Sequence, residues 1–289
     1  MRRSQVIAVE ELTFSYPGKT DFALQQVGFA VERGEILGFL GPNGAGKSTT
    51  QKILIRLLRE YQGRVEVFGR DLGQWNSDYF ERVGVSFELP NHYLKLSARE
   101  NLRYFASLYS DRTLPAGELL EKVGLSADAD TLVSQFSKGM KTRLSIARSL
   151  LNDPELIFLD EPTGGLDPVG GRQLKELIKA QKRAGKTVFL TTHDMTVADE
   201  LCDRVAFVVD GRIELLETPR ELKLEHGEHR VRVEFQQDGM TEQREFPLAG
   251  LGENRDFVRL LGTADIQTLH SLEATLEDVF VKVTGRKLH

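Results

Sequence analysis

The stretch Gly41-Pro42-Asn43-Gly44-Ala45-Gly46-Lys47-Ser48-Thr49 decides the fold of this 289-residue chain. It matches the pattern G-x-x-x-x-G-K-[ST], in which the backbone N–H groups of a glycine-rich loop surround phosphate oxygens. Apolar residues before it, at 36–40, predict a buried strand. Those after it predict one face of a helix, at Ile53, Leu54, Leu57 and Leu58. In this strand–loop–helix context we expect Lys47 to reach the β- and γ-phosphates and Ser48 to ligate Mg²⁺.

The composition limits the classes of protein to which the chain can belong. Apolar residues make up 40%, which is enough for a substantial core, and 289 residues favour one large domain or two modest ones. The formal net charge of −5, from 38 basic and 43 acidic side chains, does not favour a nucleic-acid partner. Cys202 is the single cysteine of the sequence, so an intrachain disulfide is excluded.

The sequence predicts neither a transmembrane helix nor a signal peptide. The longest uninterrupted apolar run, at 205–209, is far shorter than the about 20 apolar residues that a spanning helix needs. The apolar stretch near the N-terminus soon meets Glu10 and Glu11, unlike the apolar region of a signal peptide. Any role at a membrane is therefore expected to come through a partner.

The order of the predicted elements indicates an α/β domain over residues 1–225. Residues 1–40 predict a small antiparallel edge that leads into the phosphate loop. Residues 89–150 predict a helical subdomain, whose first helix opens with the capping-box pattern Ser97-Ala98-Arg99-Glu100. Strand signals return at 156–160 and 187–190 with a helix between them, which indicates a parallel sheet with crossover helices.

After about residue 225 the pattern changes. Residues 229–235 alternate with period two, Asp238-Gly239 predicts a turn, and 241–246 predict a return strand. Helical material follows near 256–261 and 276–283. We therefore predict a small C-terminal accessory α+β region over residues 226–289, although the pattern is equally consistent with a decorated extension of the first domain.

A second motif lies far downstream of the phosphate loop. Four apolar residues at 156–159 are followed by Asp160 and Glu161, at the end of a predicted strand. ATPases with a phosphate loop place an acidic residue there for Mg²⁺. We expect Asp160 to hold the ion directly or through water, and Glu161 to polarise the attacking water. The pattern is weak alone and strong together with the loop at 41–49.

The segment Phe136-Ser137-Lys138-Gly139-Met140 opens a predicted helix between these two motifs. With it, the chain resembles the ATP-binding subunit of ABC transporters. In this resemblance residues 41–49 are the Walker A motif, 156–161 are the Walker B motif, and 136–140 occupy the signature position. The resemblance covers about residues 5–220, and its motifs follow the order of the family.

The resemblance implies a P-loop NTPase ABC-type ATPase core that binds ATP and Mg²⁺. Gly165-Leu166-Asp167 resembles the D-loop, which places Asp167 at a dimer interface, and His193 resembles the switch histidine that contacts the γ-phosphate. The implied catalytic residues are Glu161, His193 and Lys47. The implied ATP-binding residues are those of the loop, Gly41, Pro42, Asn43, Gly44, Ala45, Gly46, Lys47, Ser48 and Thr49, with Tyr16 stacking on adenine. The implied metal ligands are Ser48, Asp160 and Glu88.

Two positions depart from the commonest pattern of the family. The signature is usually Leu-Ser-Gly-Gly-Gln, whereas this chain keeps Ser137 and Gly139 and carries Lys138 and Met140 beside them. Related exporter ATPases tolerate this variant. Glu88 stands where the family usually has a glutamine that contacts Mg²⁺ or the attacking water, and a carboxylate can also ligate Mg²⁺.

The resemblance also implies partners. Because the chain has one Walker A motif and one signature, a second ATPase subunit, either a copy or a homologue, must cover its site. In turn, the signature residues Ser137, Lys138, Gly139 and Met140 are expected to act in trans on the site of that subunit. Integral-membrane permease subunits in separate chains are expected to dock beside Glu88, near Pro90-Asn91-His92-Tyr93. The ending at 276–286 resembles exporter ATPases. We therefore predict an ATP-hydrolysing subunit of an ABC exporter, peripheral at the cytoplasmic face of the cell membrane.

The alternative is a soluble ABC-type ATPase that acts on ribosomes or DNA. Such translation factors usually carry two ATPase domains, and the DNA-maintenance relatives carry long coiled-coil insertions; the sequence predicts neither. A regulator that no longer hydrolyses ATP is disfavoured by Lys47, Asp160, Glu161 and His193. A small kinase is disfavoured by the segment at 136–140.

Overall fold

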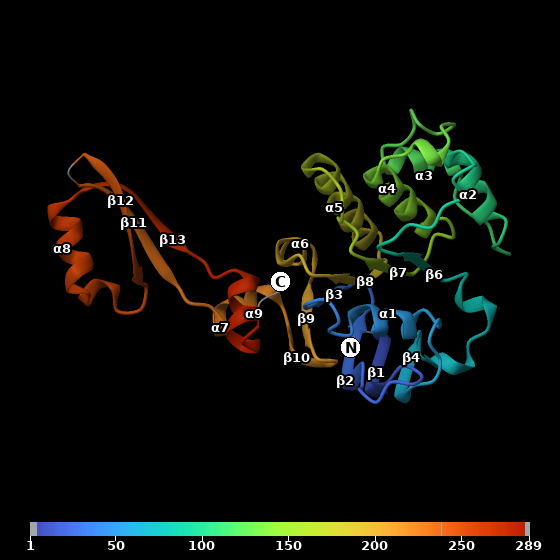
Figure 1. Cartoon of the computed structure of the whole chain (residues 1–289), viewed down its shortest axis with the longest axis horizontal. Helices are drawn as coiled ribbons and strands as arrows, with labels where there is room; N and C mark the ends of the chain where they lie inside the picture. Colours follow the sequence, from blue (N-terminus) through green and yellow to red (C-terminus); the bar gives the residue numbers. More distant parts are fainter. Residues whose placement is uncertain (1–4, 238, 287–289) are drawn as a thin grey trace. The chain divides into compact units, whose positions relative to one another are not determined.

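The computed structural model describes residues 5–237 and 239–286, and its contacts divide the chain into two compact units (Figure 1). The first unit ends at Thr218 and the second begins at Pro219. This division lies just before helix α7 (Pro219–His226), whereas the sequence pattern changes after about residue 225.

A six-stranded sheet forms the centre of the first unit, in the order β10-β9-β3-β8-β7-β6. Every neighbouring pair is parallel except β9 and β10, which form a hairpin. The carboxyl ends of β3, β8, β7 and β6 therefore meet at one edge of the sheet. The strands are β3 (Ile36–Leu40), β6 (Val83–Ser86), β7 (Leu156–Asp160), β8 (Thr187–Thr192), β9 (Arg204–Val209) and β10 (Arg212–Glu217).

Helix α5 (Pro168–Arg183) connects β7 to β8, and α6 (Met195–Leu201) connects β8 to β9. Helix α1 (Lys47–Leu54) follows β3. Strands β3 and β8 are buried along their whole length, as expected for parallel strands covered on both faces. The hairpin of β9 and β10 turns at Asp210 and Gly211, whose φ angles of 47° and 75° are those of a type I′ turn. The Asp-Gly turn predicted from the sequence is confirmed.

A second, antiparallel sheet has the order β2-β1-β4-β5. It confirms the antiparallel edge that the sequence predicts. Its strands are β1 (Gln5–Phe14), β2 (Leu24–Glu32), β4 (Gln62–Val67) and β5 (Arg70–Asp71), followed by the 3₁₀ turns η1 (Leu72–Gln74) and η2 (Ser77–Tyr79). One apolar core joins both sheets to Ile53 and Leu54 of α1, which lies between them (Figure 1).

Helix α1 is shorter than the sequence predicts. It ends at Leu54, and Arg56 adopts φ = 63°, a left-handed conformation that stops the helix. Leu57, expected on the same buried face as Ile53, is instead 61% exposed. The leucine spacing continues beyond the end of the helix, so periodicity alone did not reveal where the helix stops.

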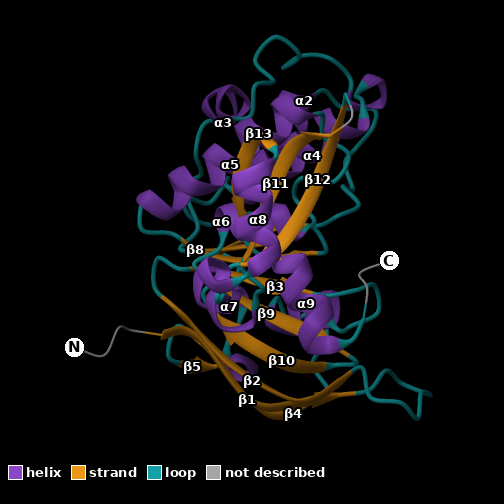
Figure 2. Ribbon diagram, turned by 90° about the vertical axis from the view of Figure 1, so that its left-hand side faces the viewer, coloured by secondary structure: helices purple, strands orange, loops and turns teal. Residues whose placement is uncertain are grey.

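The helical subdomain contains α2 (Ala98–Ala106), α3 (Ala116–Lys122), the 3₁₀ turn η3 (Val133–Gln135) and α4 (Lys138–Ser149). Its predicted capping box is confirmed: Glu100 N donates to Ser97 Oγ at 3.2 Å, and Ser97 N donates to the Glu100 carboxylate at 2.8 Å. Figure 2 shows these helices at the opposite end of the unit from β1, β2 and β4.

The second unit contains a three-stranded antiparallel sheet of order β12-β11-β13. Phe257 and Leu260 of α8 pack against Val231, Val233 and Phe235 of the central strand. Strand β13 has no counterpart in the sequence-based prediction, and Asp238 of the predicted turn lies outside the described residues. The elements are β11 (Arg230–Gln237), β12 (Met240–Pro247), η4 (Leu251–Glu253), α8 (Arg255–Thr263), β13 (Asp265–Leu272) and α9 (Leu276–Thr284), with α7 packed on α9.

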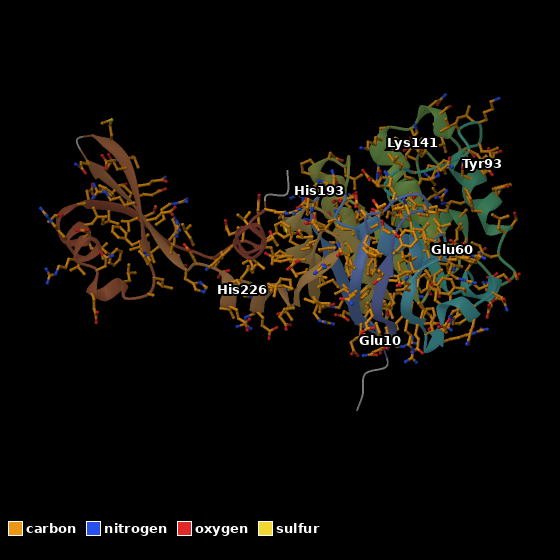
Figure 3. All side chains as sticks on the ribbon, turned by 60° about the horizontal axis from the view of Figure 1, so that its bottom comes forward. Glu10, Glu60, Tyr93, Lys141, His193 and His226 are labelled. Carbon is orange, nitrogen blue, oxygen red and sulfur yellow. The ribbon has the colours of Figure 1, made fainter. Side chains whose placement is uncertain are left out.

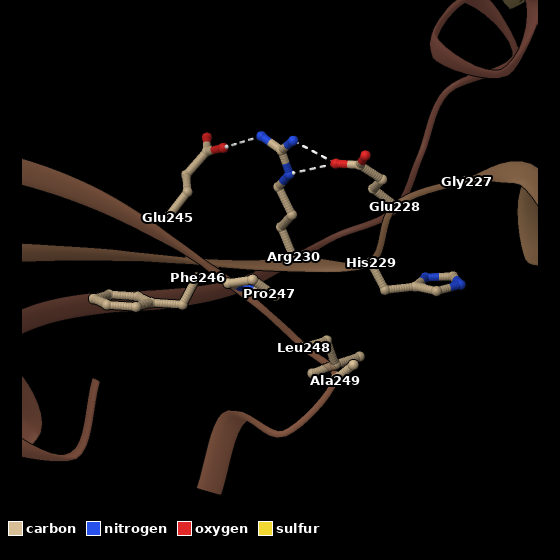
Figure 4. Close-up of a pocket in the computed structure, with 9 residues that line it drawn as sticks. All are labelled: Gly227, Glu228, His229, Arg230, Glu245, Phe246, Pro247, Leu248 and Ala249. Carbon is tan, nitrogen blue, oxygen red and sulfur yellow. Dashed lines mark hydrogen bonds and ion pairs between the residues drawn. The ribbon is translucent and has the colours of Figure 1, made fainter. Parts of the chain in front are cut away.

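A hollow of about 740 Å³ lies in the second unit (Figure 4). Arg230 pairs there with Glu228 and, at 3.4 Å, with Glu245, while Phe246 and Leu248 supply apolar surface. None of the helices that the structure describes combines the length and the apolar character that a bilayer-spanning helix needs.

Candidate functional site

The phosphate loop follows β3 and requires glycine at three positions. Gly44 and Gly46 have φ angles of 83° and 108°, a region that L side chains rarely adopt. A Cβ on Gly46 would lie 2.7 Å from Leu24 Cδ2, and one on Gly41 would lie 2.1 Å from the Val208 carbonyl oxygen. The loop is therefore packed closely against neighbouring strands, and its backbone is exposed where Asn43 and Gly44 turn. This glycine backbone forms a cradle of the kind that binds phosphate groups.

Lys47 begins α1 and points back into the loop. Its Nζ donates to the carbonyl oxygens of Gly41 at 2.6 Å and Pro42 at 3.1 Å. Burial lowers the pKa of Lys47, whereas the nearby carboxylates of Glu161, Asp160 and Glu88 raise it. A cation held by two loop carbonyl oxygens and close to three carboxylates is placed to bind the phosphates of a nucleotide.

Asp160 ends β7 beside the phosphate loop. Thr191 of β8 donates a hydrogen bond to Asp160 Oδ1, and the two residues are paired in the parallel register. Burial raises the pKa of Asp160; the hydrogen bond from Thr191 lowers it, Glu88 raises it, and Lys47 lowers it. The buried carboxylate is thus held close to cationic Lys47 by the strand next to it.

Glu161 lies in a strained conformation next to His193. Its φ of 46° is unusual for a residue with a side chain. Glu161 Oε2 accepts from Thr192 Oγ1 at 2.8 Å, and Oε1 accepts from His193 N at 2.9 Å and lies 2.7 Å from His193 Nδ1. The Glu161 side chain is 12% exposed and the His193 side chain 49% exposed. The end of β8 therefore fixes the direction in which this carboxylate points.

Glu88 and Tyr16 border the same site. Glu88 is exposed in the loop after β6, and its charge acts on both Lys47 and Asp160. Tyr16 follows β1, is 36% exposed, and its hydroxyl lies 3.1 Å from Thr49 Oγ1. The exposed ring beside α1 provides a surface on which a base can stack.

The signature segment and the D-loop pack against each other. Ser137 caps α4 by accepting from Met140 N at 3.2 Å. A Cβ on Gly139 would lie 3.3 Å from Leu166 Cδ2, and one on Gly165 would lie 2.8 Å from Lys138 Cδ. Ser137 and Lys138 are exposed, as is Asp167, the residue that precedes α5. These side chains are accessible to a second subunit.

Three residues of the site escaped the sequence-based prediction: Gln51, Thr191 and Thr192. All three are buried, and the two threonines contact Asp160 and Glu161. Thr191-Thr192 directly precedes His193, so a strand ending in two hydroxyls was visible in the sequence. The register that brings them to the carboxylates was not.

The donors at this site fit ATP with Mg²⁺. Among residues 5–237 and 239–286 no cluster of three or more histidine, cysteine or acidic side chains could hold a metal ion by itself. Mg²⁺ commonly takes one or two protein oxygens together with the phosphates of its nucleotide. Asp160 and the half-buried Ser48, next to the glycine cradle, are suited to this arrangement.

A phosphate loop, a carboxylate pair and a histidine in contact with Glu161 at the edge of one parallel sheet define a nucleotide-hydrolysing P-loop protein. The chain belongs to the ABC transporter family. A model of the ABC transporter family matches residues 24–164, and a model of the fluoroquinolone efflux ABC transporter C-terminal domain matches residues 229–273.

The chain aligns with ATP-binding proteins of transporters over nearly the whole length of both sequences. The chain is 56% identical over 286 residues to the fluoroquinolones export ATP-binding protein of Mycobacterium tuberculosis (strain ATCC 25618 / H37Rv), covering 99% of this chain and 95% of that protein. It is 34% identical to the bacitracin transport ATP-binding protein BcrA of Bacillus licheniformis, covering 98% of each.

Among solved structures, the chain resembles a dimeric ATP-binding cassette in a post-hydrolysis state bound to ADP and Pi. The TM-score is 0.66 at 28% identity, covering 73% of this chain and 98% of that one. The predicted fold, and the predicted function as the ATP-binding, ATP-hydrolysing subunit of an ABC exporter, are confirmed by these comparisons.

Proposed function

We propose that this chain powers the export of drugs of the fluoroquinolone class through separate membrane subunits. The observation that carries the proposal is the 56% identity over 286 residues to a fluoroquinolones export ATP-binding protein, which includes the second unit. The match of residues 229–273 to a fluoroquinolone efflux C-terminal domain supports it independently of the ATPase motifs.

The site supports the following division of roles. Lys47 and the backbone amides of the loop bind the phosphates, and Tyr16 stacks on the adenine. Ser48 and Asp160 hold Mg²⁺. Glu88, whose charge acts on Lys47 and Asp160, adds a carboxylate oxygen to the ion. Glu161 accepts a proton from the attacking water. His193 orients the Glu161 carboxylate through its backbone and ring nitrogens and contacts the γ-phosphate. When bound, Mg²⁺ supplies charge that balances the phosphates during transfer.

A second ATPase subunit completes the site in this proposal. The exposed Ser137 and Lys138, with Gly139 and Met140 behind them, would face the nucleotide of that subunit, and Asp167 would lie at the interface. Ser137 is the N-cap of helix α4, so the positive end of the helix dipole adds to the attraction for phosphate. A copy of this chain or a homologue fits equally.

The helical subdomain is the proposed docking site for the permease. Exposed apolar side chains follow Glu88 in the chain, among them Tyr93, which is labelled in Figure 3. The ring centroids of Tyr93 and Tyr104 lie 4.7 Å apart. Such exposed apolar surface is typical of an interaction site. Docking there would place the chain at the cytoplasmic face of the membrane. The exposed side chains are Leu89, Tyr93, Leu94, Tyr104 and Leu108.

The proposal is tested by expressing the chain together with its permease in a drug-sensitive bacterium. Intracellular fluoroquinolone is measured for the wild type, for Lys47→Ala and for the control Lys19→Ala, which changes an exposed lysine outside the loop. We expect the wild type and the control to lower drug accumulation and Lys47→Ala to abolish the effect. Equal accumulation in all three, with ATPase activity intact in the wild type, would refute fluoroquinolones as the cargo.

A further inference from the structure

Two adjacent carboxylates at the end of β7 meet two adjacent threonines at the end of β8. Thr191 donates to Asp160 Oδ1, and Thr192 Oγ1 donates to Glu161 Oε2 at 2.8 Å. Both threonines are fully buried, and Asp160 and Thr191 are partners in the strand register. Successive residues of a strand point to opposite faces. The hydroxyls therefore hold the two carboxylates in different directions.

Gln51 of α1 lies behind Thr191. It is 2% exposed, and its side-chain oxygen lies 3.2 Å from Thr191 Oγ1. Within the described part of the chain, Gln51 Nε2 is buried and has no hydrogen-bond partner. A buried N–H group without a hydrogen-bond partner raises the free energy of the folded state, and such groups are rare in folded proteins.

The number of hydroxyl protons resolves the arrangement. Thr191 has one O–H, and the charged carboxylate of Asp160 is its strongest acceptor. The Gln51 atom that faces Thr191 must then be a donor, so the amide is turned with its nitrogen toward Thr191. Amide nitrogen and oxygen differ little in shape, and their placement follows from hydrogen bonding. The turned amide pairs one of the two N–H groups of Gln51 with Thr191 Oγ1, and it leaves the carbonyl oxygen unpaired, which is less costly than an unpaired N–H.

We propose that Gln51 and Thr191 form a hydrogen-bond relay that positions Asp160 for the metal ion, while Thr192 separately positions Glu161. Gln51 lies one helical turn after Ser48 on α1, so the relay ties the Asp160 carboxylate to the helix that carries Lys47 and Ser48. The relay rests on the proposed role of Asp160 as a Mg²⁺ ligand. Gln51, Thr191 and Thr192 are positioning residues.

The two threonines therefore have separable effects. Groups that orient a metal ligand typically change metal affinity by about 10–100-fold when removed. Loss of the Thr191 hydroxyl should lower the affinity of the site for the metal ion and leave the binding of metal-free nucleotide unchanged. Loss of the Thr192 hydroxyl should leave the metal affinity unchanged and lower kcat through Glu161.

The test measures Mn²⁺ binding by electron paramagnetic resonance, in the presence of a non-hydrolysable ATP analogue. We expect Thr191→Val to weaken Mn²⁺ binding about 10-fold, Thr191→Ser to restore it, and Thr192→Val to leave it unchanged. Binding of the analogue in EDTA should be the same in all three. Wild-type Mn²⁺ affinity in a folded Thr191→Val, shown by an unchanged Tm, would overturn the relay.

Gln51 variants test the orientation of the amide. They also test the relay if Thr191→Val does not fold. Gln51→Glu cannot donate at neutral pH and repels Asp160, so it should weaken Mn²⁺ binding more than Gln51→Met. Equal binding in Gln51→Glu and the wild type would also overturn the relay. Asp160→Asn separates the two proposals. If it keeps its Mn²⁺ affinity, the metal role of Asp160 fails. If it loses affinity while Thr191→Val does not, only the relay fails.

Discussion

Replacing Glu161 with glutamine removes the proposed general base and disturbs the surrounding geometry least. The carboxylate accepts from Thr192 Oγ1 at 2.8 Å and from His193 N at 2.9 Å. An amide oxygen can still accept from His193 N, and the amide nitrogen can donate to the Thr192 hydroxyl. The variant should therefore fold and bind ATP, but its side chain cannot take a proton from water.

The size of the effect follows from these contacts. General-base catalysis typically contributes about 10²–10⁴-fold, which corresponds to about 2.7–5.4 kcal/mol in the activation barrier. The 2.7 Å contact with His193 Nδ1 loses its charge. Because the His193 side chain is 49% exposed, we expect the free energy of unfolding to fall by only about 1 kcal/mol or less.

The assay follows phosphate release, nucleotide binding and oligomeric state in the presence of Mg²⁺ and ATP. We expect Glu161→Gln to bind ATP with wild-type affinity, to lose at least about 10²-fold in turnover, and to accumulate as an ATP-bound dimer. Glu176→Gln, on the exposed face of α5, is the matched control and should behave as wild type. Turnover of Glu161→Gln within about threefold of the wild type would exclude a general-base role.

Three further predictions concern other parts of the first unit. Gly84→Ala should destabilise the fold by about 1–3 kcal/mol or more in urea unfolding, because its Cβ would lie 1.9 Å from the Ser149 carbonyl oxygen. Gly171→Ala, where no described atom lies within 4 Å of such a Cβ, should not destabilise. Burial lowers the pKa of His92 from 6.5 to about 4. The stability contributed by neutral His92 is therefore complete above pH 6.5 and is lost as the pH falls toward 4. In urea unfolding, the free energy of unfolding of His92→Gln should therefore fall less than that of the wild type between pH 6.5 and pH 4. Glu88→Gln should keep ATPase activity and change its Mg²⁺/Mn²⁺ dependence. An unchanged metal profile would show that Glu88 does not contact the ion.

The elements that bear the motifs could be predicted because each depends on local chemistry. The capping box at Ser97 and Glu100 and the Asp210-Gly211 turn are set by a few neighbouring residues, and both are confirmed. Strand β13 could not be predicted in the same way. Its alternation is weak, with Leu269 48% exposed, and it becomes a strand by pairing with β11. Strand propensity depends on such neighbours more than helix propensity does.

The sequence by itself determined the phosphate loop, the Asp160-Glu161 pair and His193, because spacing and residue type specify that chemistry. Tertiary structure alone decided how these groups are held. Thr191 and Thr192 reach the two carboxylates only because β7 and β8 pair in parallel with Asp160 opposite Thr191. Gln51 reaches Thr191 only because α1 packs on β8. Strand register and helix packing depend on residues far apart in the chain, and no local pattern records them.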